Sequence, residues 1–233
     1  MHLRSCSILR WSRMKNSEFD KAIAFILEGD TELEFYLRFV ALLCEKHGYT
    51  IEHSADEYTY EPIDVIKKEN GDKILVKYDV VGTISSMNKS AVWFKTQCRR
   101  NYQTNWCVCL CYDTDDYTED VTRFHEGDWL QLRTKLKGAN PIIDMAASAD
   151  IEDIMLLDME GICGYLEADI ANVPDKLPGS KGKKKMKNLF RLFGNTYHEG
   201  CRAQSLIETL DMQLLIDKAP LPLRRLENWF IAG

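Results

Sequence analysis

Two short apolar runs, each ending in an acidic residue, constrain the fold of this chain more than any other feature. The first, KAIAFIL (21–27), runs directly into Glu28, and the second, WCVCLCYD (106–113), ends in Asp113. A continuous apolar run of this length fits a strand that is buried on both faces. Such strands occupy the centre of parallel sheets that carry helices on both sides. The sequence therefore predicts an α/β fold with a buried parallel sheet.

The rest of the chain alternates between strand and helix patterns, as this fold requires. Apolar residues at every third or fourth position predict a helix over 30–47. Asp30 or Thr31 is expected to cap this helix, and Thr31 with Glu34 has the spacing of a capping box. Further strands are expected at 73–82 and 141–148, and a weak strand within 49–60. Segment 62–72 is expected to hold a short helix and a turn. Further helices are expected at 90–103, 126–138, 150–166, 203–220 and 223–232.

Length and composition fit one α/β domain, or one domain with an appendage. The chain has 233 residues, of which 45% are hydrophobic, enough to bury a sizeable core. We expect a flexible lead-in at 1–20 and a catalytic core at 21–172. The remainder, 173–233, is expected to form a basic loop and helices that pack on the core or on a partner.

Several features predict a cytoplasmic protein. No apolar run approaches the roughly 20 residues that would span a membrane, and the basic start of the chain has too short and broken an apolar stretch for a signal peptide. The eight cysteines are therefore expected to be reduced thiols. Cys107, Cys109 and Cys111 alternate and would share one face of a strand. They are interpreted as small buried hydrophobic residues rather than as ligands of a soft metal.

Charge is segregated along the chain. The net charge of −6 argues against general coating of nucleic acid, yet segment 181–191, KGKKKMKNLFR, holds six basic residues and no acid. Acids concentrate in EGDTELE (28–34) and DTDDYTED (113–120). This distribution fits a polyanion held by the basic segment and cations held by the acidic ones. The alternative is a solvated lysine loop that binds nothing.

The acids that follow the two buried strands form the candidate site. Open parallel sheets bind ligands at the carboxyl ends of their strands. If the two strands are neighbours, Glu28, Asp113 and Asp115 converge there, and their repulsion requires protons or a divalent cation. Oxygen ligands without a nearby histidine favour Mg²⁺ or Mn²⁺ over zinc. Gly29 is expected to let the backbone turn sharply beside the bound group.

This arrangement resembles the TOPRIM domain, in which one strand ends in Glu, often Glu-Gly, and a later strand ends in Asp-x-Asp. Glu28-Gly29 corresponds to the first motif, and Asp113 with Asp115 to the second. The segment LEGDTELEFY (27–36) is similar to the opening of RloB-like and OLD-type TOPRIM proteins, where Glu-Gly is soon followed by Thr-Glu and an aromatic residue. The resemblance spans roughly 21–190.

A third motif strengthens the likeness to RloB-like proteins. They carry a Pro-x-Phe-Glu-x-Trp-Leu-Leu segment, and ASADIEDIMLLD (147–158) is similar to it, with Ile151-Glu152 in place of Phe-Glu. The chain departs from the motif at Ala149, where proline is usual, and at Ile154, where tryptophan is usual. The lysine-rich stretch follows about where such proteins place basic residues.

The resemblance implies a compact parallel-sheet core and a Mg²⁺-dependent nuclease, commonly acting in bacterial anti-phage defence beside an ATPase partner. Asp113 and Asp115 would be metal ligands, and Glu28 a ligand or general acid/base. Further metal ligands would be Glu32, Asp116 and Glu152. Catalytic stabilisation of the scissile phosphate is assigned to Lys181, Lys183 or Lys184, with Lys183 preferred, and nucleic-acid binding to Lys181, Lys183, Lys184, Lys185 and Lys187.

Simpler roles stay open at this point. Glu32 and Glu152 also suit the first turn of a helix, and Asp116 a capping position. A non-catalytic adaptor would keep the fold and dock an ATPase through the C-terminal helix with Trp229, Phe230 and Ile231. A small-molecule phosphatase built on the same acids is a third possibility. DNA and RNA are both open as substrates, and so is a homo-oligomer.

Overall fold

A six-stranded mixed sheet forms the centre of the protein, in the order β2-β3-β4-β1-β5-β6. The computed structural model describes residues 18–118 and 128–232, so the predicted lead-in at 1–20 lies almost wholly outside the described residues. The strands are β1 (Lys21–Leu27), β2 (Thr50–Ala55), β3 (Pro62–Lys67), β4 (Lys73–Val80), β5 (Asn105–Asp113) and β6 (Ala139–Ala147). Strands β4, β1, β5 and β6 run parallel to one another, whereas β3 is antiparallel to both of its neighbours.

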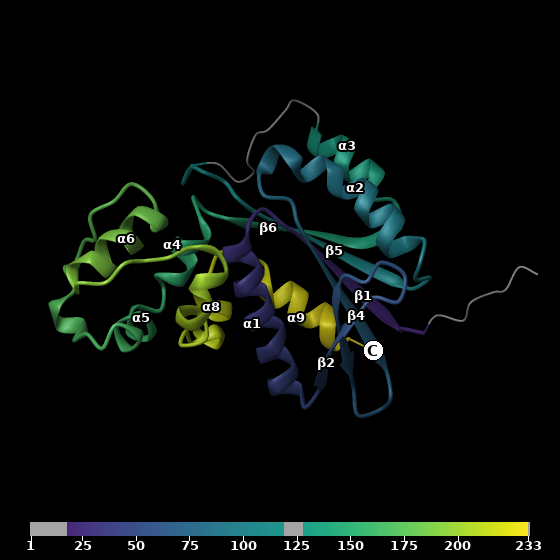
Figure 1. Ribbon diagram of the computed structural model, residues 1–233, viewed down its shortest axis with the longest axis horizontal. Helices are drawn as coiled ribbons and strands as arrows, with labels where there is room; N and C mark the ends of the chain where they lie inside the picture. Colours follow the sequence, from purple (N-terminus) through teal and green to yellow (C-terminus); the bar gives the residue numbers. More distant parts are fainter. Residues whose placement is uncertain (1–17, 119–127, 233) are drawn as a thin grey trace, which may run out of the picture.

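Helices lie on both faces of this sheet. They are α1 (Asp30–His47), α2 (Ser90–Trp93), α3 (Asp128–Lys135), α4 (Ile151–Met155), α5 (Met159–Tyr165), α6 (Gly182–Leu192), α7 (Gln204–Ile207), α8 (Met212–Lys218) and α9 (Leu223–Ile231). Shorter turns are η1 (Ile84–Lys89), the π-helical η2 (Phe94–Arg99), η3 (Ile170–Asn172) and η4 (Gly200–Ala203). Figure 1 shows α2 and α3 on one side of the sheet and α1 and α9 on the other.

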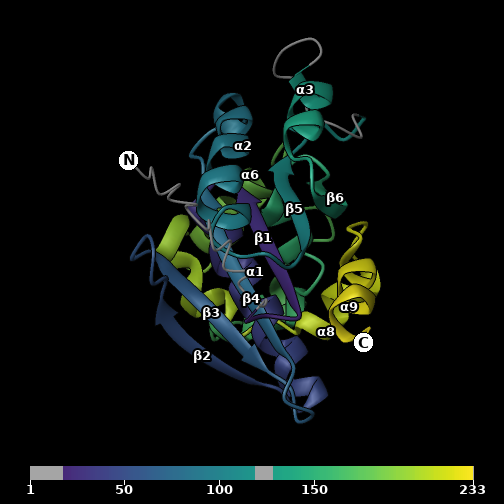
Figure 2. The same cartoon turned by 90° about the vertical axis from the view of Figure 1, so that its right-hand side faces the viewer.

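The central strand β1 explains why the chain needs an uninterrupted apolar run. Its alternate side chains enter two separate cores, with Phe25 in the core on the α1 face and Ala24 in the core beneath α2 and α3. Because both faces of β1 are covered, a polar residue on either side would be buried without a partner. The predicted parallel-sheet core with helices on both faces is thus confirmed, and Figure 2 shows β1 between β4 and β5.

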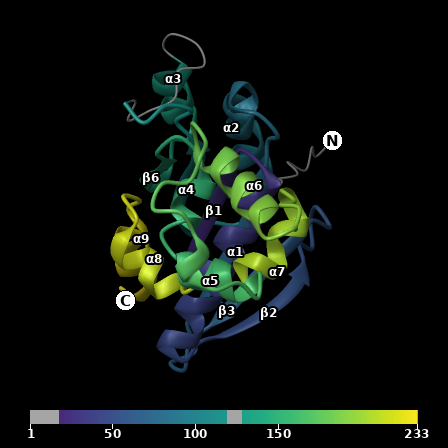
Figure 3. The same ribbon diagram turned by 90° about the vertical axis from the view of Figure 1, so that its left-hand side faces the viewer.

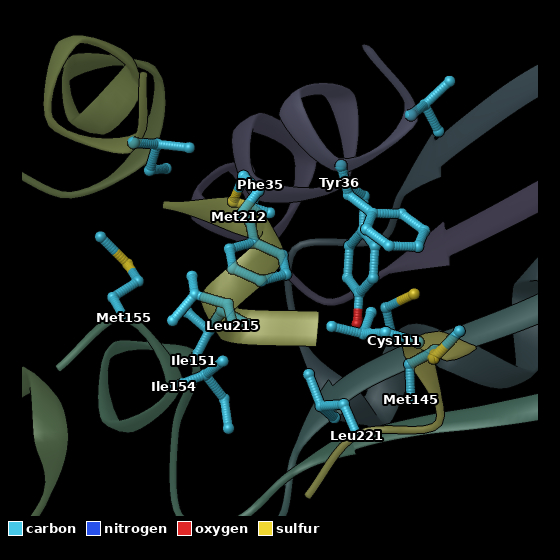
Figure 4. Close-up of a cluster of buried hydrophobic side chains, with 14 of the residues drawn as sticks. Phe35, Tyr36, Cys111, Met145, Ile151, Ile154, Met155, Met212, Leu215 and Leu221 are labelled. Atoms are coloured by element: carbon cyan, nitrogen blue, oxygen red, sulfur yellow. The ribbon is translucent and has the colours of Figure 1, made fainter. Parts of the chain in front are cut away.

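The core on the α1 face also contains the three alternating cysteines. Cys107, Cys109 and Cys111 are fully buried in it, and burial raises the pKa of the Cys109 and Cys111 thiols well above the ordinary value. In Figure 4 the hydroxyl of Tyr36 points toward Cys111, among apolar side chains from α4 and α8. The seven cysteines within the described residues are all free thiols, as predicted.

Helix α1 begins differently from the predicted cap. Gly29 is the N-cap, and no side chain caps the helix. The Thr31 hydroxyl instead accepts a hydrogen bond from the Gly200 backbone N–H at 2.8 Å. The capping-box prediction was wrong because Thr31 is engaged by a distant segment, 195–200, which we call the strap. The predicted end of α1 is confirmed, since Gly48 adopts a left-handed conformation with φ 68°.

Three other element predictions were wrong. Segment 62–72 was expected to hold a short helix, but 62–67 forms β3, because pairing between β2 and β4 buries Ile63 on one face of the sheet and Ile66 on the other. The helix expected at 150–166 is divided into α4 and α5 by Asp158, whose carboxylate caps α5. Asp211 likewise divides the helix expected at 203–220. In both cases a side-chain acceptor satisfies backbone donors and starts a new helix.

The C-terminal helices contribute to the same core as α1 and β1. Phe230 of α9 is fully buried, and its ring lies 5.7 Å from that of Tyr49. Trp229 packs partly buried against this core, whereas Ile231 is 38% exposed. The apolar side of α9 is therefore covered by the protein itself. No helix within the described parts of the chain is both long enough and apolar enough to span a membrane.

Phe230→Ala is expected to lower the free energy of unfolding by about 3–5 kcal/mol, because it leaves a cavity in the core. Chemical denaturation monitored by circular dichroism measures the change. Ile231→Ala, one residue away and partly exposed, is the matched control and should cost less than about 1 kcal/mol. Equal effects of the two substitutions would contradict the packing described for α9.

Candidate active site

Glu28 and Asp113 meet at the carboxyl ends of two neighbouring parallel strands. β1 and β5 are paired up to Leu27 and Cys111, and the Glu28 backbone N–H donates to the Cys111 carbonyl at 3.0 Å. β1 ends here, so the next backbone donor of β5 on this side lacks a strand partner. The Glu28 carboxylate takes that place and accepts from the Asp113 N–H, with an N···O distance of 3.2 Å. The structure therefore brings these two predicted residues together.

Glu32 and Glu152 add two more buried carboxylates. Glu32 lies in the first turn of α1 and Glu152 in the first turn of α4, with 6% and 1% of their surfaces exposed. The Tyr197 hydroxyl donates to Glu152 Oε1 at 2.9 Å. Burial of this degree is more than a solvated first-turn acid would show. Glu28, Glu32, Asp113 and Glu152 are called the acidic cluster below.

Gly29 has a different role from the predicted sharp turn. Its φ of −147° and ψ of 177° are extended, a conformation open to any residue. A β-carbon at this position would lie 2.9 Å from Glu32 Oε2. Glycine is therefore favoured here by the close approach of the Glu32 carboxylate to the backbone, and not by the backbone angles.

Mutual repulsion in a buried setting controls the protonation of the acidic cluster. Burial, followed by the charges of Glu32 and Glu28, raises the pKa of Asp113 to about 9. Burial, with the charges of Glu28 and Glu152, raises the pKa of Glu32 to about 7. The pKa values of Glu28 and Glu152 are also raised, chiefly by burial. Near neutral pH the cluster therefore retains protons unless a cation neutralises it.

Asp115 and Asp116 lie outside the buried part of this cluster. Asp115 has a left-handed backbone, with φ 63°, and its side chain is 66% exposed. Its carboxylate pairs with Lys181 Nζ at 2.7 Å. Asp116 Oδ1 accepts from the backbone N–H and the hydroxyl of Thr118, both at 2.8 Å. Their roles as metal ligands stay predictions, and the contacts of Asp116 belong to a turn with Thr118.

Asp150 is a site residue that sequence reasoning missed. Its carboxylate caps α4 by accepting from Asp153 N–H and also accepts from Lys183 N–H at 3.0 Å. It therefore joins α4 to the start of α6. The approach is so close that a β-carbon on Gly182 would lie 2.1 Å from the Asp153 nitrogen. A signal existed, because Asp150 closely follows strand β6, as Glu28 follows β1.

The basic segment lies on α6, beside α4 (Figure 3). Carboxylates of the protein already contact most of its lysines. Each pair has a short distance between the lysine Nζ and a carboxylate oxygen: Lys181 to Asp115 2.7 Å, Lys183 to Glu199 2.9 Å, Lys185 to Asp153 2.7 Å and Lys187 to Glu199 2.5 Å. Among the described residues no carboxylate pairs with Lys184. The segment is thus a partly neutralised surface rather than an isolated positive patch.

Two open cavities connect the acidic cluster to this lysine surface. One, of about 420 Å³, is lined by Asp113, Asp115, Asp150, Ser180, Lys181, Lys183, Lys184 and Lys187. The other, of about 390 Å³, is lined by Glu28, Glu32, Asp113, Lys183 and Glu199 among others. Asp113 and Lys183 line both cavities. A phosphate group entering from either side would therefore meet a carboxylate and a lysine together.

The carboxylate oxygens of the acidic cluster are the type of ligand that Mg²⁺ prefers, although they do not surround a single point. Within 18–118 and 128–232, no three His, Cys, Asp or Glu side chains are gathered closely enough to enclose a metal ion. Mg²⁺, however, is commonly held by one or two carboxylates, with waters and substrate phosphates completing its shell. Glu28 and Asp113 supply such a pair of oxygen donors, and no histidine takes part in the cluster.

Comparisons with known proteins do not add a family to this geometry. No protein-family model matches the chain, and no curated protein shows significant sequence similarity to it. The likeness to TOPRIM proteins accordingly rests on the three short motifs and stays a prediction. The α/β architecture and the acidic cluster stand on the structure itself.

Stability without divalent cations is expected to fall as pH rises from 5 to 9. A carboxyl group whose folded pKa is raised binds more protons in the folded state, so stability is lost between its ordinary pKa and the raised value. For Asp113 this window extends from 3.8 to about 9. Asp113→Asn should flatten the slope and raise the free energy of unfolding at pH 8 by about 1–3 kcal/mol.

Urea unfolding in EDTA at several pH values measures this slope. Asp217→Asn is the matched control, because Asp217 is 46% exposed and pairs with Arg224 outside the cluster. That variant should keep the slope of the unsubstituted protein. A slope unchanged in Asp113→Asn would contradict the electrostatic account of the cluster.

Proposed function

We propose that this protein is a Mg²⁺-dependent endonuclease that hydrolyses phosphodiester bonds of DNA or RNA in the cytoplasm. The observation that carries the proposal is the meeting of the half-buried Glu28 and Asp113 at the ends of β1 and β5, with lysines of α6 lining the same cavities. A buried carboxylate cluster has a high affinity for divalent cations because they relieve its repulsion. Lysines next to it would attract a phosphate backbone.

Each group in the cluster has a chemical role under this proposal. Glu28 and Asp113 would hold Mg²⁺ or Mn²⁺, which when bound polarises a phosphate oxygen and acidifies water. Glu32, with a pKa of about 7, is suited to accept or return a proton near neutral pH. Lys183, which lines both cavities, would offset charge that develops on the scissile phosphate.

The Glu152 carboxylate is held by Tyr197 and is suited to a second cation or to positioning the first. Asp115 could join the metal shell only by leaving Lys181, with which it pairs in the structure. The remaining lysines of α6, Lys181, Lys184, Lys185 and Lys187, would contact the phosphate backbone of a nucleic acid. The proposal retains an ATPase partner and a role in anti-phage defence, on the strength of the motif resemblance alone.

The adaptor alternative has no specific observation in its favour. That hypothesis needs Trp229, Phe230 and Ile231 to be available for docking, but Phe230 is fully buried and Trp229 packs on the protein's own core, which leaves Ile231 partly exposed. We therefore retain the nuclease as the proposed function.

Purified protein is expected to cleave DNA or RNA when Mg²⁺ or Mn²⁺ is added and to be inactive in EDTA. Glu28→Gln and Asp113→Asn should each lower the cleavage rate at least about a hundredfold, because each removes a charge that holds the cation. Glu28→Gln retains an acceptor oxygen for the Asp113 N–H, so the strand end should stay intact. Gel assays with labelled single- and double-stranded substrates measure the rates.

Asp217→Asn is the charge-matched control for these assays and should retain full cleavage. Calorimetric titration with Mn²⁺ gives an independent readout, because binding should weaken in Glu28→Gln and Asp113→Asn but not in the control. Cleavage that persists undiminished in both cluster variants would sink the proposed function.

A further inference from the structure

Glu199 stands out among the carboxylates around the basic segment because it contacts two lysines at once. Lys183 and Lys187, one turn apart on α6, direct their ammonium groups at its two carboxylate oxygens, at 2.9 and 2.5 Å. Two lysines at this spacing lie on the same side of a helix and can hold one anion between them. This is the arrangement that a phosphate group with two accessible oxygens would also satisfy.

The strap (195–200) holds Glu199 in this position from both sides. On the N-terminal side of Glu199, the Asn195 N–H donates to the Phe190 carbonyl at 2.8 Å, and the Tyr197 hydroxyl donates to the Glu152 carboxylate. On the C-terminal side, the Gly200 N–H donates to the Thr31 hydroxyl at 2.8 Å. Gly200 has φ 69°, a left-handed conformation in which a side chain would be strained. The backbone at Glu199 is thus held between the start of α1 and α6, while the carboxylate itself contacts the two lysines.

The ion pairs that Glu199 makes are suited to exchange. Partial burial alone would raise its pKa, but the hydrogen bonds from Lys187 and Lys183 outweigh burial and lower the pKa below the ordinary value. The group is therefore ionised near neutral pH. All three side chains are still 36–47% exposed, and ion pairs of this exposure contribute little net stability. A phosphate could replace the carboxylate at low cost.

Glu199 lies in one of the two cavities that lead to the acidic cluster. It lines the same cavity as Glu28, Glu32 and Asp113, and its partner Lys183 also lines the cavity on the other side. While the carboxylate is in place it satisfies Lys183 and adds a negative charge next to a site that already repels anions. A substrate phosphate that approached Asp113 through this cavity would meet a lysine that is already paired and an additional negative charge.

We propose that Lys183 and Lys187 form a phosphate-binding subsite and that Glu199 is its internal occupant, which a nucleic-acid backbone displaces on binding. The identity of the ligand as a nucleic acid rests on the proposed function. The inference adds that the Glu199 carboxylate competes with the ligand's phosphate for Lys183 and Lys187. Glu199 is accordingly a gating residue and not a catalytic one. Its removal should strengthen binding of the phosphate backbone even when no divalent cation is present.

The test measures affinity for a short fluorescein-labelled single-stranded oligonucleotide, in DNA and RNA versions, by fluorescence anisotropy in EDTA. Glu199→Gln should bind more tightly than the unsubstituted protein, by up to about tenfold. Glu45→Gln is the matched control, since Glu45 is an exposed glutamate paired with Arg38 and its loss changes net charge equally. The control should bind like the unsubstituted protein.

A second set of variants tests the lysines. Adding Lys183→Gln and Lys187→Gln to Glu199→Gln should abolish the gain in affinity, whereas adding Lys68→Gln and Lys73→Gln, far from α6, should preserve it. The proposal is overturned if Glu199→Gln binds no more tightly than Glu45→Gln, or if its gain survives loss of both α6 lysines. Thermal melting of every variant verifies folding, and a Glu199 variant that unfolds is replaced by Glu199→Ser.

Cleavage assays separate this inference from the proposed function. A gain in affinity without cleavage in Mg²⁺ or Mn²⁺ would leave the phosphate subsite in place and remove the nuclease. Cleavage by the unsubstituted protein without a gain in Glu199→Gln would support the nuclease and remove the subsite.

Discussion

Repulsion among buried carboxylates is the constraint on which the functional half of this structure depends. Glu32 and Glu152 are buried, and the half-buried Glu28 and Asp113 lie beside them at the ends of β1 and β5. Such a cluster is stable only if protons, cations or hydrogen-bond donors offset its charge. The protein supplies a tyrosine hydroxyl, backbone N–H groups and nearby lysines, and the raised pKa of Asp113 shows that these do not offset the charge completely. Strongly shifted pKa values of this kind are found most often at functional sites.

The pairing of β1 with β5 brings Glu28 and Asp113 to the same edge of the sheet. β1 and β5 are parallel neighbours, so their carboxyl ends open at one edge of the sheet, and both are followed at once by acids. α6 then docks against α4 through Asp150 and Gly182, which brings the lysines to the same edge. The strap runs from α6 to α1, where Tyr197 contacts the buried Glu152 and Gly200 contacts Thr31. Positive and negative segments that are far apart in sequence thereby form one surface.

The pairing of lysines with acids changes how the basic segment is understood. In sequence, 181–191 reads as a free positive stretch, but in the structure Asp115, Asp153 and Glu199 already contact four of its lysines. Any polyanion must therefore compete with the protein's own carboxylates, and any cation that attracts Asp115 would release Lys181. Binding of cations and of phosphates at this edge would consequently be linked, since each partner frees a group that the other needs.

The sequence by itself determined the two buried strands, the start of α1 after Glu28 and the acids at the strand ends, because continuous apolar runs and strand ends are local signals. The meeting of Glu28 with Asp113 followed only once β1 and β5 were paired as neighbours. The sequence did not determine β3, the breaks at Asp158 and Asp211, or the partner of Thr31, since each depends on which other segment supplies the hydrogen-bond partner. Only the tertiary structure decided that Asp115 turns outward, that Asp150 joins α4 to α6, and that Glu199 lies between two lysines. A sequence gives the position of each charged residue along the chain. Which charged groups contact one another depends on how the helices and strands pack together.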